Sequence, residues 1–277
     1  MSFDPALPDD RVNVSKGHAV REAVVLVAGI AGVAAALFVA IALAIDLLAP
    51  LVPARVEAAL FDGDWVEALV LQVEDGEPDP RASDVARLLD RMAGHWPDNP
   101  YRYRVALLDD ATPNAMALPG GLIVVTTGLL DGVTSENELA FVLGHELGHF
   151  RNRDHLRGLG RNLAIALVTS ALGLSGAAAA AQLVSLSGAL ADRGFGRDEE
   201  LDADRFGLEL VYSEYGHVGS VSDFFAQTPD PASGAEERIA DWFSTHPLDD
   251  DRIEALDGIA RERGWPSAGD AVPFSGR

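Results

Sequence analysis

The chain has 277 residues, no cysteine, and a formal charge of −22 from 21 basic and 43 acidic residues. This length supplies enough apolar material for one large domain or two small ones. Without cysteine, the chain can form neither a disulfide scaffold nor a cysteine-ligated zinc or iron–sulfur site. The strongly negative charge argues against nucleic acid as a partner, because binding to phosphate needs clustered lysine and arginine.

An apolar segment near the N-terminus, residues 23–45, contains no charged side chain. As a helix it is long enough to cross a bilayer core of about 30 Å. A cleaved signal peptide would have a shorter apolar core behind a short basic start, whereas a largely polar stretch with several acidic residues precedes this one. We therefore expect an uncleaved transmembrane anchor over 23–49, with the lipid bilayer as the partner of residues 23–45.

The basic residues that flank this segment are distributed unequally. Arg11, Lys16 and Arg21 precede it, and only Arg55 follows it closely. Flanks with more positive charge tend to stay in the cytoplasm. The sequence therefore predicts a single-pass protein of the cell (inner) membrane in which the rest of the chain lies outside the cytoplasm, on the periplasmic side.

Beyond the anchor, the patterns predict an α+β fold that is mainly helical. Apolar residues recur at helical spacing over 54–72 and 83–94. Two runs rich in branched and aromatic residues, 101–108 and 122–127, predict strands. The expected divisions are a polar tail over 1–22, the anchor over 23–49, a helical linker or subdomain over 50–100, a main domain over 101–265 and a C-terminal tail over 266–277.

The motif His-Glu-x-x-His at residues 145–149 carries the strongest chemical signal. Residues four apart share one face of a helix, so His145 and His149 can converge on one ion, while Glu146 points toward the water that the ion activates. Imidazole and carboxylate ligands in a tetrahedral site with one open position suit zinc, and we expect one Zn²⁺ per chain. Glu146 can take a proton from that water and deliver it to the leaving amine.

The surroundings of the motif argue against a chance match. Ser135 followed by Glu138 predicts a capping box at the start of an apolar helix. Two histidines and a glutamate in such a helix are costly to bury without partners. Gly144 and Gly148 also weaken a helix. We therefore expect another backbone to approach the helix closely at these two glycines.

A third protein ligand is expected from residues 196–210, which predict a helix with Glu200 and Asp204 on one face. Glu200 can bind the metal, and Asp204 can accept the free N–H of a ligating histidine and so fix its tautomer. Spacing alone does not choose between Glu199 and Glu200. An ordinary acidic surface helix is the alternative.

Residues 162–191 carry no charge and are long enough to form a second span. Gly173, Gly176 and Gly188 interrupt the run, and polar residues dilute it. A single crossing would put the two halves of the metal site on opposite sides of the membrane, so only zero or two crossings are allowed. We expect an apolar helical hairpin packed against the main domain.

Several motifs together resemble the HtpX and CAAX-prenyl-protease class of membrane-linked zinc metallopeptidases. HExxH is followed, 55 residues after its first histidine, by Glu-x-x-Ala-Asp. Residues 114–121 (NAMALPGG) resemble the strand that precedes the active-site helix in that class, and Thr245-His246-Pro247 with Arg252-Ile253 resembles its C-terminal His-Pro segment. The resemblance covers residues 100–260 and implies a zincin-like domain with a small sheet whose edge strand borders the active site.

The resemblance also implies roles for individual residues. The zinc ligands would be His145, His149 and Glu200, and Glu146 would be the general base. Asp204 would not bind the metal but would accept the N–H of a ligating histidine. His246 would lie near the metal, either as an oxyanion stabiliser or as a switchable fourth ligand. The single span is similar to members with a largely globular domain, the BepA, LoiP and Oma types. This implies unfolded or misassembled proteins as substrates, in membrane protein quality control, rather than prenylated proteins.

The strand at 122–127 is the expected substrate-binding edge of the sheet. An unpaired edge offers N–H and C=O groups to which an extended peptide can add as a further strand. The alternative is an interior strand, which the apolar run at 123–125 would also fit. The expected substrate contacts are Asn114, Gly120, Gly121, Val124 and Val125.

These observations predict a membrane-anchored zinc endopeptidase. The alternative is a non-hydrolytic chaperone or scaffold in which the zinc site is structural or closed. A structural site usually has four protein ligands, and His246 is the residue that could supply the fourth.

Overall fold

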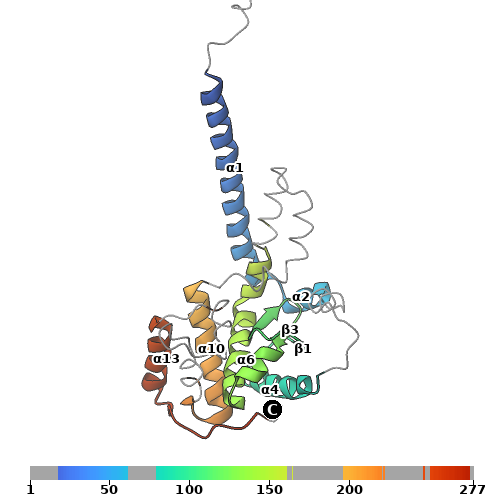
Figure 1. The fold of residues 1–277 in the computed structure, drawn as a ribbon, viewed down its shortest axis with the longest axis vertical. Coiled ribbons are helices and arrows are strands. Elements are labelled where there is room, and N and C mark those ends of the chain that lie inside the picture. Colours follow the sequence, from blue (N-terminus) through green and yellow to red (C-terminus); the bar gives the residue numbers. More distant parts are fainter. Residues whose placement is uncertain are drawn as a thin grey trace, which may run out of the picture.

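The computed structural model describes residues 18–61, 79–160, 164, 196–219, 221, 246 and 250–274. In this part of the chain, one long helix rises from a body of packed helices and a small mixed sheet (Figure 1). The mainly helical α+β fold with an N-terminal apolar helix is therefore confirmed. Residues 62–72 of the predicted helix over 54–72, and the predicted hairpin over 162–191 apart from Ala164, lie outside the described residues.

The long helix, α1 (Ala19–Leu48), contains the apolar segment predicted at 23–45. Together with the short 3-10 turn η2 (Ala49–Leu51), it is long and apolar enough to cross a membrane. None of the residues in its most apolar stretch is buried in the protein. A core helix of a soluble protein would bury these side chains, whereas Val33 is 70% exposed. A second short helix, α2 (Ala54–Phe61), follows immediately and packs on the body.

The sheet contains β1 (Arg104–Leu108), β2 (Ala115–Leu118) and β3 (Leu122–Thr126), in the order β1-β3-β2. β3 runs parallel to β1 and antiparallel to β2, and all five of its residues are buried. The prediction that 122–127 forms the sheet edge is therefore wrong. Its continuous apolar run is what an interior strand covered on both faces requires.

Val124 and Val125 were expected to offer an outward amide to a peptide. Because β3 has a partner on each side, with Val125 opposite both Leu107 and Ala115, its amides belong to the sheet ladders. The hydrogen bond from Thr126 N–H to the Asn114 carbonyl (3.0 Å) fixes the alternation along β2. In an antiparallel pair only alternate residues face the partner strand, so Ala115 and Ala117 turn their backbone groups away from β3. β2 is the edge strand on this side.

Gly120 and Gly121 form the turn between β2 and β3, with φ of +85° and +82°. This left-handed conformation strains residues that carry a Cβ. A Cβ on Gly120 would lie 2.8 Å from the Phe61 Cβ, and one on Gly121 would lie 2.3 Å from the Arg102 carbonyl oxygen. Both glycines are therefore required by packing within this chain, and the Gly120 N–H already donates to Glu57. Their contact with a peptide stays a prediction.

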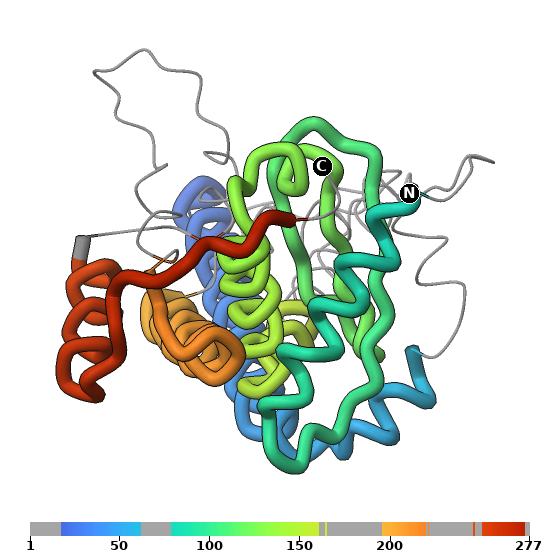
Figure 2. The backbone as a smooth tube through the Cα atoms, turned by 90° about the horizontal axis from the view of Figure 1, so that it is seen from below, coloured from blue at the N-terminus to red at the C-terminus, as the bar shows by residue number. Residues whose placement is uncertain are grey.

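The central helix of the body is α6 (Glu136–Asn152), whose residues from Asn137 to Phe150 are all buried. Figure 2 shows α6 between α10 (Arg197–Tyr215) on one side and the sheet with α4 (Arg81–Gly94) on the other. The described part also includes α5 (Thr127–Gly132), which follows β3, and α13 (Asp250–Arg263), which packs against α10.

The start of α6 follows the predicted capping pattern in part. The Ser135 hydroxyl accepts the Glu138 N–H (3.3 Å), as predicted, but the Glu138 carboxylate accepts from Thr134 N–H (2.6 Å). The chain beyond α13 returns to this end of the helix, where Val272 N–H donates to the Asn137 side chain (2.7 Å).

α6 and α10 touch through their backbones. A Cβ on Gly148 would lie 2.6 Å from the Cα of Ala203, and one on Gly144 would lie 2.9 Å from the Cα of Gly207. The expected close approach of another backbone to the two glycines is confirmed. It brings the acidic face of α10 against the His-Glu-x-x-His face of α6.

Candidate metal centre

Three histidines and one glutamate converge between α6 and α10. One ligand atom from each of His145, His149, Glu200 and His246 lies within 4.8 Å of the other three, and all four residues are buried. The His145 Nε2 and His149 Nε2 atoms are 3.0 Å apart. Glu200 oxygens lie 3.6 and 3.7 Å from these two nitrogens. The structure therefore brings together the residues that the sequence placed on two separate helices.

α10 presents Glu200, not Glu199, to this cluster. Glu199 lies at the helix start, partly exposed, and its carboxylate accepts the Gly196 N–H (2.9 Å). Glu200 is 1% exposed. Acidic residues at a helix N-terminus are common because they cap free N–H groups, which is why spacing alone left both glutamates open.

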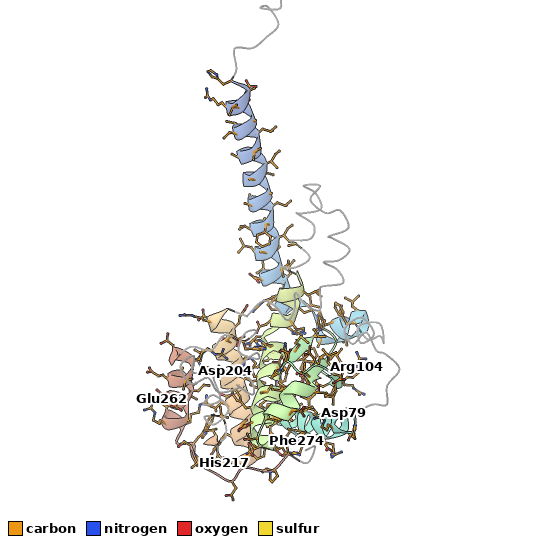
Figure 3. The ribbon with its side chains drawn as sticks, in the orientation of Figure 1. Asp79, Arg104, Asp204, His217, Glu262 and Phe274 are labelled. Carbon is orange, nitrogen blue, oxygen red and sulfur yellow. The ribbon has the colours of Figure 1, made fainter. Side chains whose placement is uncertain are left out.

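Two aspartates orient the imidazoles of α6. Asp204 lies on α10 (Figure 3), and its Oδ1 is 2.8 Å from His145 Nδ1. Asp154 Oδ2 lies 3.0 Å from His149 Nδ1. A carboxylate accepts, so each Nδ1 carries the proton and each neutral ring presents a lone pair at Nε2. The two lone pairs then face each other at 3.0 Å with no proton between them. This arrangement fits a bound cation, and the donor set suits zinc.

Sequence patterns gave no indication of Asp154. It follows the end of α6, where Arg153 turns the chain back with φ of +64°. A carboxylate five residues after the second histidine is the signal that could have indicated it.

Glu146 lies beside the cluster without being part of it. The Ala117 backbone N–H on β2 faces its carboxylate, and burial raises the pKa of Glu146 above its usual value. Its Oε1 has no hydrogen-bond partner among the described residues, and the nearest basic nitrogen, His246 Nε2, is 3.6 Å away. A buried carboxylate oxygen of this kind needs a donor, which a water molecule on the metal side would supply.

His246 faces the cluster with its other nitrogen. Its Nδ1 lies 3.0 Å from His145 Nε2 and 3.3 Å from Glu200 Oε1. The same ring therefore touches both the ligand cluster and Glu146. This geometry accommodates either of the two roles expected for His246.

Arg252, on α13, forms ion pairs with both Asp204 and Glu200. Its guanidinium lies 2.7 Å from Asp204 Oδ2 and 3.0 Å from Glu200 Oε2, and it donates to the His246 carbonyl (3.2 Å). In the sequence, Arg252 stood out only as part of the His-Pro segment. In the structure, the buried positive charge of Arg252 balances the carboxylates of Glu200 and Asp204.

The electrostatics of His145 and Glu200 favour the protonation states that metal binding needs, whereas the pKa shifts of Asp204 and His149 run the other way. Burial lowers the pKa of His145 well below its usual value, which keeps the ring neutral. Burial opposes ionisation of Glu200, but the charges and the hydrogen bond of the surrounding imidazoles, led by His246, hold its pKa at about 2. Burial raises the pKa of Asp204 despite its contact with Arg252. Burial alone would lower the pKa of His149, and the hydrogen bond to Asp154 reverses this.

The residue expected to anchor a peptide main chain, Asn114, lies at the start of β2. Its backbone is engaged with β3, because its carbonyl accepts from Thr126 N–H (3.0 Å) and its N–H donates to the Thr126 hydroxyl (2.8 Å). The edge that faces α6 begins one residue later, at Ala115.

Comparison of the sequence with known protein families identifies the family of this chain. Residues 80–260 match the profile of peptidase family M48. The chain belongs to peptidase family M48. This confirms the class of membrane-linked metallopeptidases that the motifs resembled, and M48 metalloproteases use zinc.

The similar proteins include metalloendopeptidases of mitochondria and metalloproteases of bacteria. The mitochondrial metalloendopeptidase OMA1 of Danio rerio is 30% identical over 228 residues, which cover 74% of this chain and 46% of the relative. The metalloprotease LoiP of Escherichia coli is 29% identical over 185 residues, 64% of this chain and 71% of the relative. A putative beta-barrel assembly-enhancing protease of Vibrio cholerae is 29% identical over 170 residues, 58% of this chain and 34% of the relative. The chain thus spans less than half the length of the zebrafish relative.

Proposed function

We propose that this M48 chain is a zinc-dependent endopeptidase in which His145, His149 and Glu200 hold the metal and Glu146 is the general base. The observation that carries the proposal is the pair of imidazole Nε2 atoms 3.0 Å apart, with Glu200 beside them and the orphan oxygen of Glu146 at their side. A structural metal site has no use for a buried carboxylate oxygen that lacks a donor next to its ligands.

Zinc bound in such a site acts as a Lewis acid and lowers the pKa of water to about 7. Glu146 then takes the proton of the attacking water and passes it to the leaving amine. Its raised pKa suits both steps, because the carboxylate must accept a proton and give it up again. Asp204 and Asp154 hold the two imidazoles in the tautomer that presents Nε2 to the metal.

The outward edge of β2 is the proposed substrate-binding strand. Ala117 N–H faces Glu146, so a peptide added along this edge would pass directly over the general base. Recognition through backbone groups depends little on side chains. It therefore suits unfolded or misassembled protein substrates.

α1 is the proposed membrane anchor, with the catalytic body outside the cytoplasm. The support is the exposed apolar surface of residues 19–51 and the excess of basic residues before it. Figure 1 shows that the C-terminal end of α6, next to the metal cluster, lies on the side of the body from which α1 projects. This placement, together with a relative named as a putative beta-barrel assembly-enhancing protease, supports a role in membrane protein quality control.

The test compares three variants of the full chain in detergent. Glu146→Gln should retain about one zinc per chain and lose hydrolysis of casein, because this glutamate acts on water and not on the metal. Glu200→Ala should lose both zinc and activity. Glu199→Gln, one residue away on the same helix, is the matched control and should behave as wild type. Cleavage at the wild-type rate by Glu146→Gln would sink the mechanism.

One observation favours a second candidate, a closed site without hydrolysis. His246 Nδ1 lies as close to the ligand cluster as the ligands lie to one another, so His246 could complete a four-ligand zinc site. If His246 closes the site, His246→Ala should raise the rate of proteolysis. If instead its Nε2 donates to the oxyanion, the same change should lower kcat by roughly 10²–10³. A wild-type chain and a His246→Ala chain that both bind zinc and cleave nothing would favour the scaffold.

A further inference from the structure

A buried carboxylate outside the metal cluster connects the membrane-proximal helix to both sides of the site. Glu57, on α2, is 1% exposed. Its carboxylate accepts from Tyr101 Oη (2.9 Å), Gly120 N–H (3.0 Å), Arg153 Nη1 (2.6 Å) and His155 Nε2 (2.8 Å). These four donors come from three segments that are distant in sequence. A buried charge is tolerated only when it is paired in this way, and nothing in the proposed reaction uses it.

Two of the donors flank the aspartate that orients His149. Arg153 and His155 both bind Glu57, and Asp154 between them lies 3.0 Å from His149 Nδ1. The His155 ring also faces the His149 carbonyl with its Nδ1 (3.3 Å). The direction in which Asp154 points is therefore set by neighbours that are themselves held by Glu57.

The turn at Arg153 needs such support. Its φ of +64° is a left-handed conformation that disfavours residues with a Cβ. Two contacts of the guanidinium hold it there: the hydrogen bond to the Glu57 carboxylate, and the Tyr101 ring, whose centroid is 5.0 Å away.

Glu57 also holds the turn next to β2, the proposed substrate-binding strand. The Gly120 N–H that it accepts belongs to the turn between β2 and β3, and Phe61 of α2 packs against the same glycine. β2 is the strand whose outer edge faces Glu146. One side chain on α2 thus contacts both the segment behind the metal ligands and the turn that carries the edge strand.

α2 is joined to α1 through only five residues, 49–53. The last turns of α1 also contact the segment that follows His155, because Gly160 lies against the Ile45 side chain. The end of the apolar helix and α2 therefore dock on the same stretch, residues 153–160.

We propose that Glu57 is a positioning residue, which links the docking of the membrane-proximal helix α2 to the placement of His149 and of strand β2. The proposal rests on the function proposed above. It predicts that the metal site reaches its competent geometry only while α2 is docked. It also gives the membrane segment a part in building the site, beyond attachment.

The decisive measurement is zinc affinity, which does not depend on cleavage. In full-length protein in detergent, with a competing chromophoric chelator, Glu57→Gln should weaken zinc binding about 10–100-fold, the range for partners that support a metal ligand from outside. It should also lower kcat and raise KM for unfolded casein. Glu214→Gln is the matched control, since Glu214 also binds one arginine and one histidine (2.7 Å each) but on α10 away from the site. It should lower the melting temperature and leave zinc affinity unchanged.

A double variant tests the route through Asp154. If Glu57 acts by holding Asp154, then Glu57→Gln combined with Asp154→Asn should bind zinc as Asp154→Asn does alone. Two independent effects would multiply, and that result would overturn the proposal, as would wild-type zinc affinity in folded Glu57→Gln. Should Glu57→Gln fail to fold, His155→Gln removes one of the four donors and must show the same loss of affinity. A wild-type chain that binds zinc but cleaves nothing would refute the proposed function and still leave this test decisive.

Discussion

The contact between α6 and α10 allows a quantitative test of how the site is assembled. Replacing Gly148 by alanine would put a Cβ 2.6 Å from the Cα of Ala203 and 3.0 Å from its Cβ, where ordinary contacts lie at 3.4–4 Å. Both neighbours are backbone or first side-chain atoms and cannot turn away. α10 must therefore move from α6 by about 1 Å, the difference between these distances.

Stability and chemistry should respond differently to this shift. Overpacking costs about 1–3 kcal/mol, and alanine in a helix regains about 1 kcal/mol relative to glycine, so the free energy of unfolding should fall by about 0–2 kcal/mol. Glu200 moves with α10, whereas zinc–ligand distances tolerate only about 0.2 Å. Zinc affinity should therefore fall more than tenfold. A misplacement near 1 Å should also lower kcat/KM by about 10².

Gly158→Ala is the matched control, because Gly158 also lies in a helical stretch but has no atom within 4 Å of the place that a Cβ would occupy. It should be neutral or slightly stabilising, with unchanged zinc affinity. Thermal unfolding, chelator competition and casein hydrolysis measure the three quantities for both variants. If folded Gly148→Ala binds zinc and cleaves casein as wild type does, the site does not depend on this close contact.

Three further predictions follow from other parts of the fold. Ala117→Pro removes the outward amide that faces Glu146, so it should raise KM and also lower kcat, with zinc retained. Met116→Pro removes a ladder amide and should unfold the protein; equal effects would refute β2 as the substrate edge. Burial opposes ionisation of Glu57, but the hydrogen bond and charge of His155 lower its pKa, so its stabilisation is present above its unfolded pKa of about 4.5 and lost as pH falls through the lower folded value. The difference in melting temperature between wild type and Glu57→Gln should therefore shrink from pH 7 to pH 3, and a constant difference would contradict this. Protease added to intact spheroplasts should digest the body that follows residues 19–51; protection until lysis would reverse the orientation.

The sequence predicted the parts of the site that local pattern determines. The spacing of His145 and His149 on one helix face needs no tertiary information, and the two glycines in that helix indicated a close neighbour that the structure identifies as α10. Family resemblance then selected Glu200. Burial now gives the physical reason for that choice, since Glu199 caps the helix start.

What the sequence did not predict depends on contacts between distant segments. The apolar run of β3 fits an interior strand, but the turn and the zinc helix beside it suggested an edge, and only the pairing with both β1 and β2 decides. Asp154 gains its role from a backbone turn at Arg153. Glu57 looks like any exposed helix glutamate until three distant segments are seen around it. Charged groups whose function lies in long-range pairing leave no periodic signal.

The shortness of β2 sets how strongly this protein can hold an extended chain. Its four residues turn only Ala115 and Ala117 outward, and the Ala117 N–H already faces Glu146, so at most three backbone hydrogen bonds remain for a peptide. At roughly 0.5–1.5 kcal/mol each, they contribute about 1.5–4.5 kcal/mol, which the entropy of association largely offsets. A freely diffusing peptide should therefore bind weakly and leave quickly. If α1 anchors the chain as proposed, a substrate held in the same bilayer would meet the strand at a high effective concentration without any new contact, and confinement to the membrane plane would supply the selectivity that so short a strand lacks.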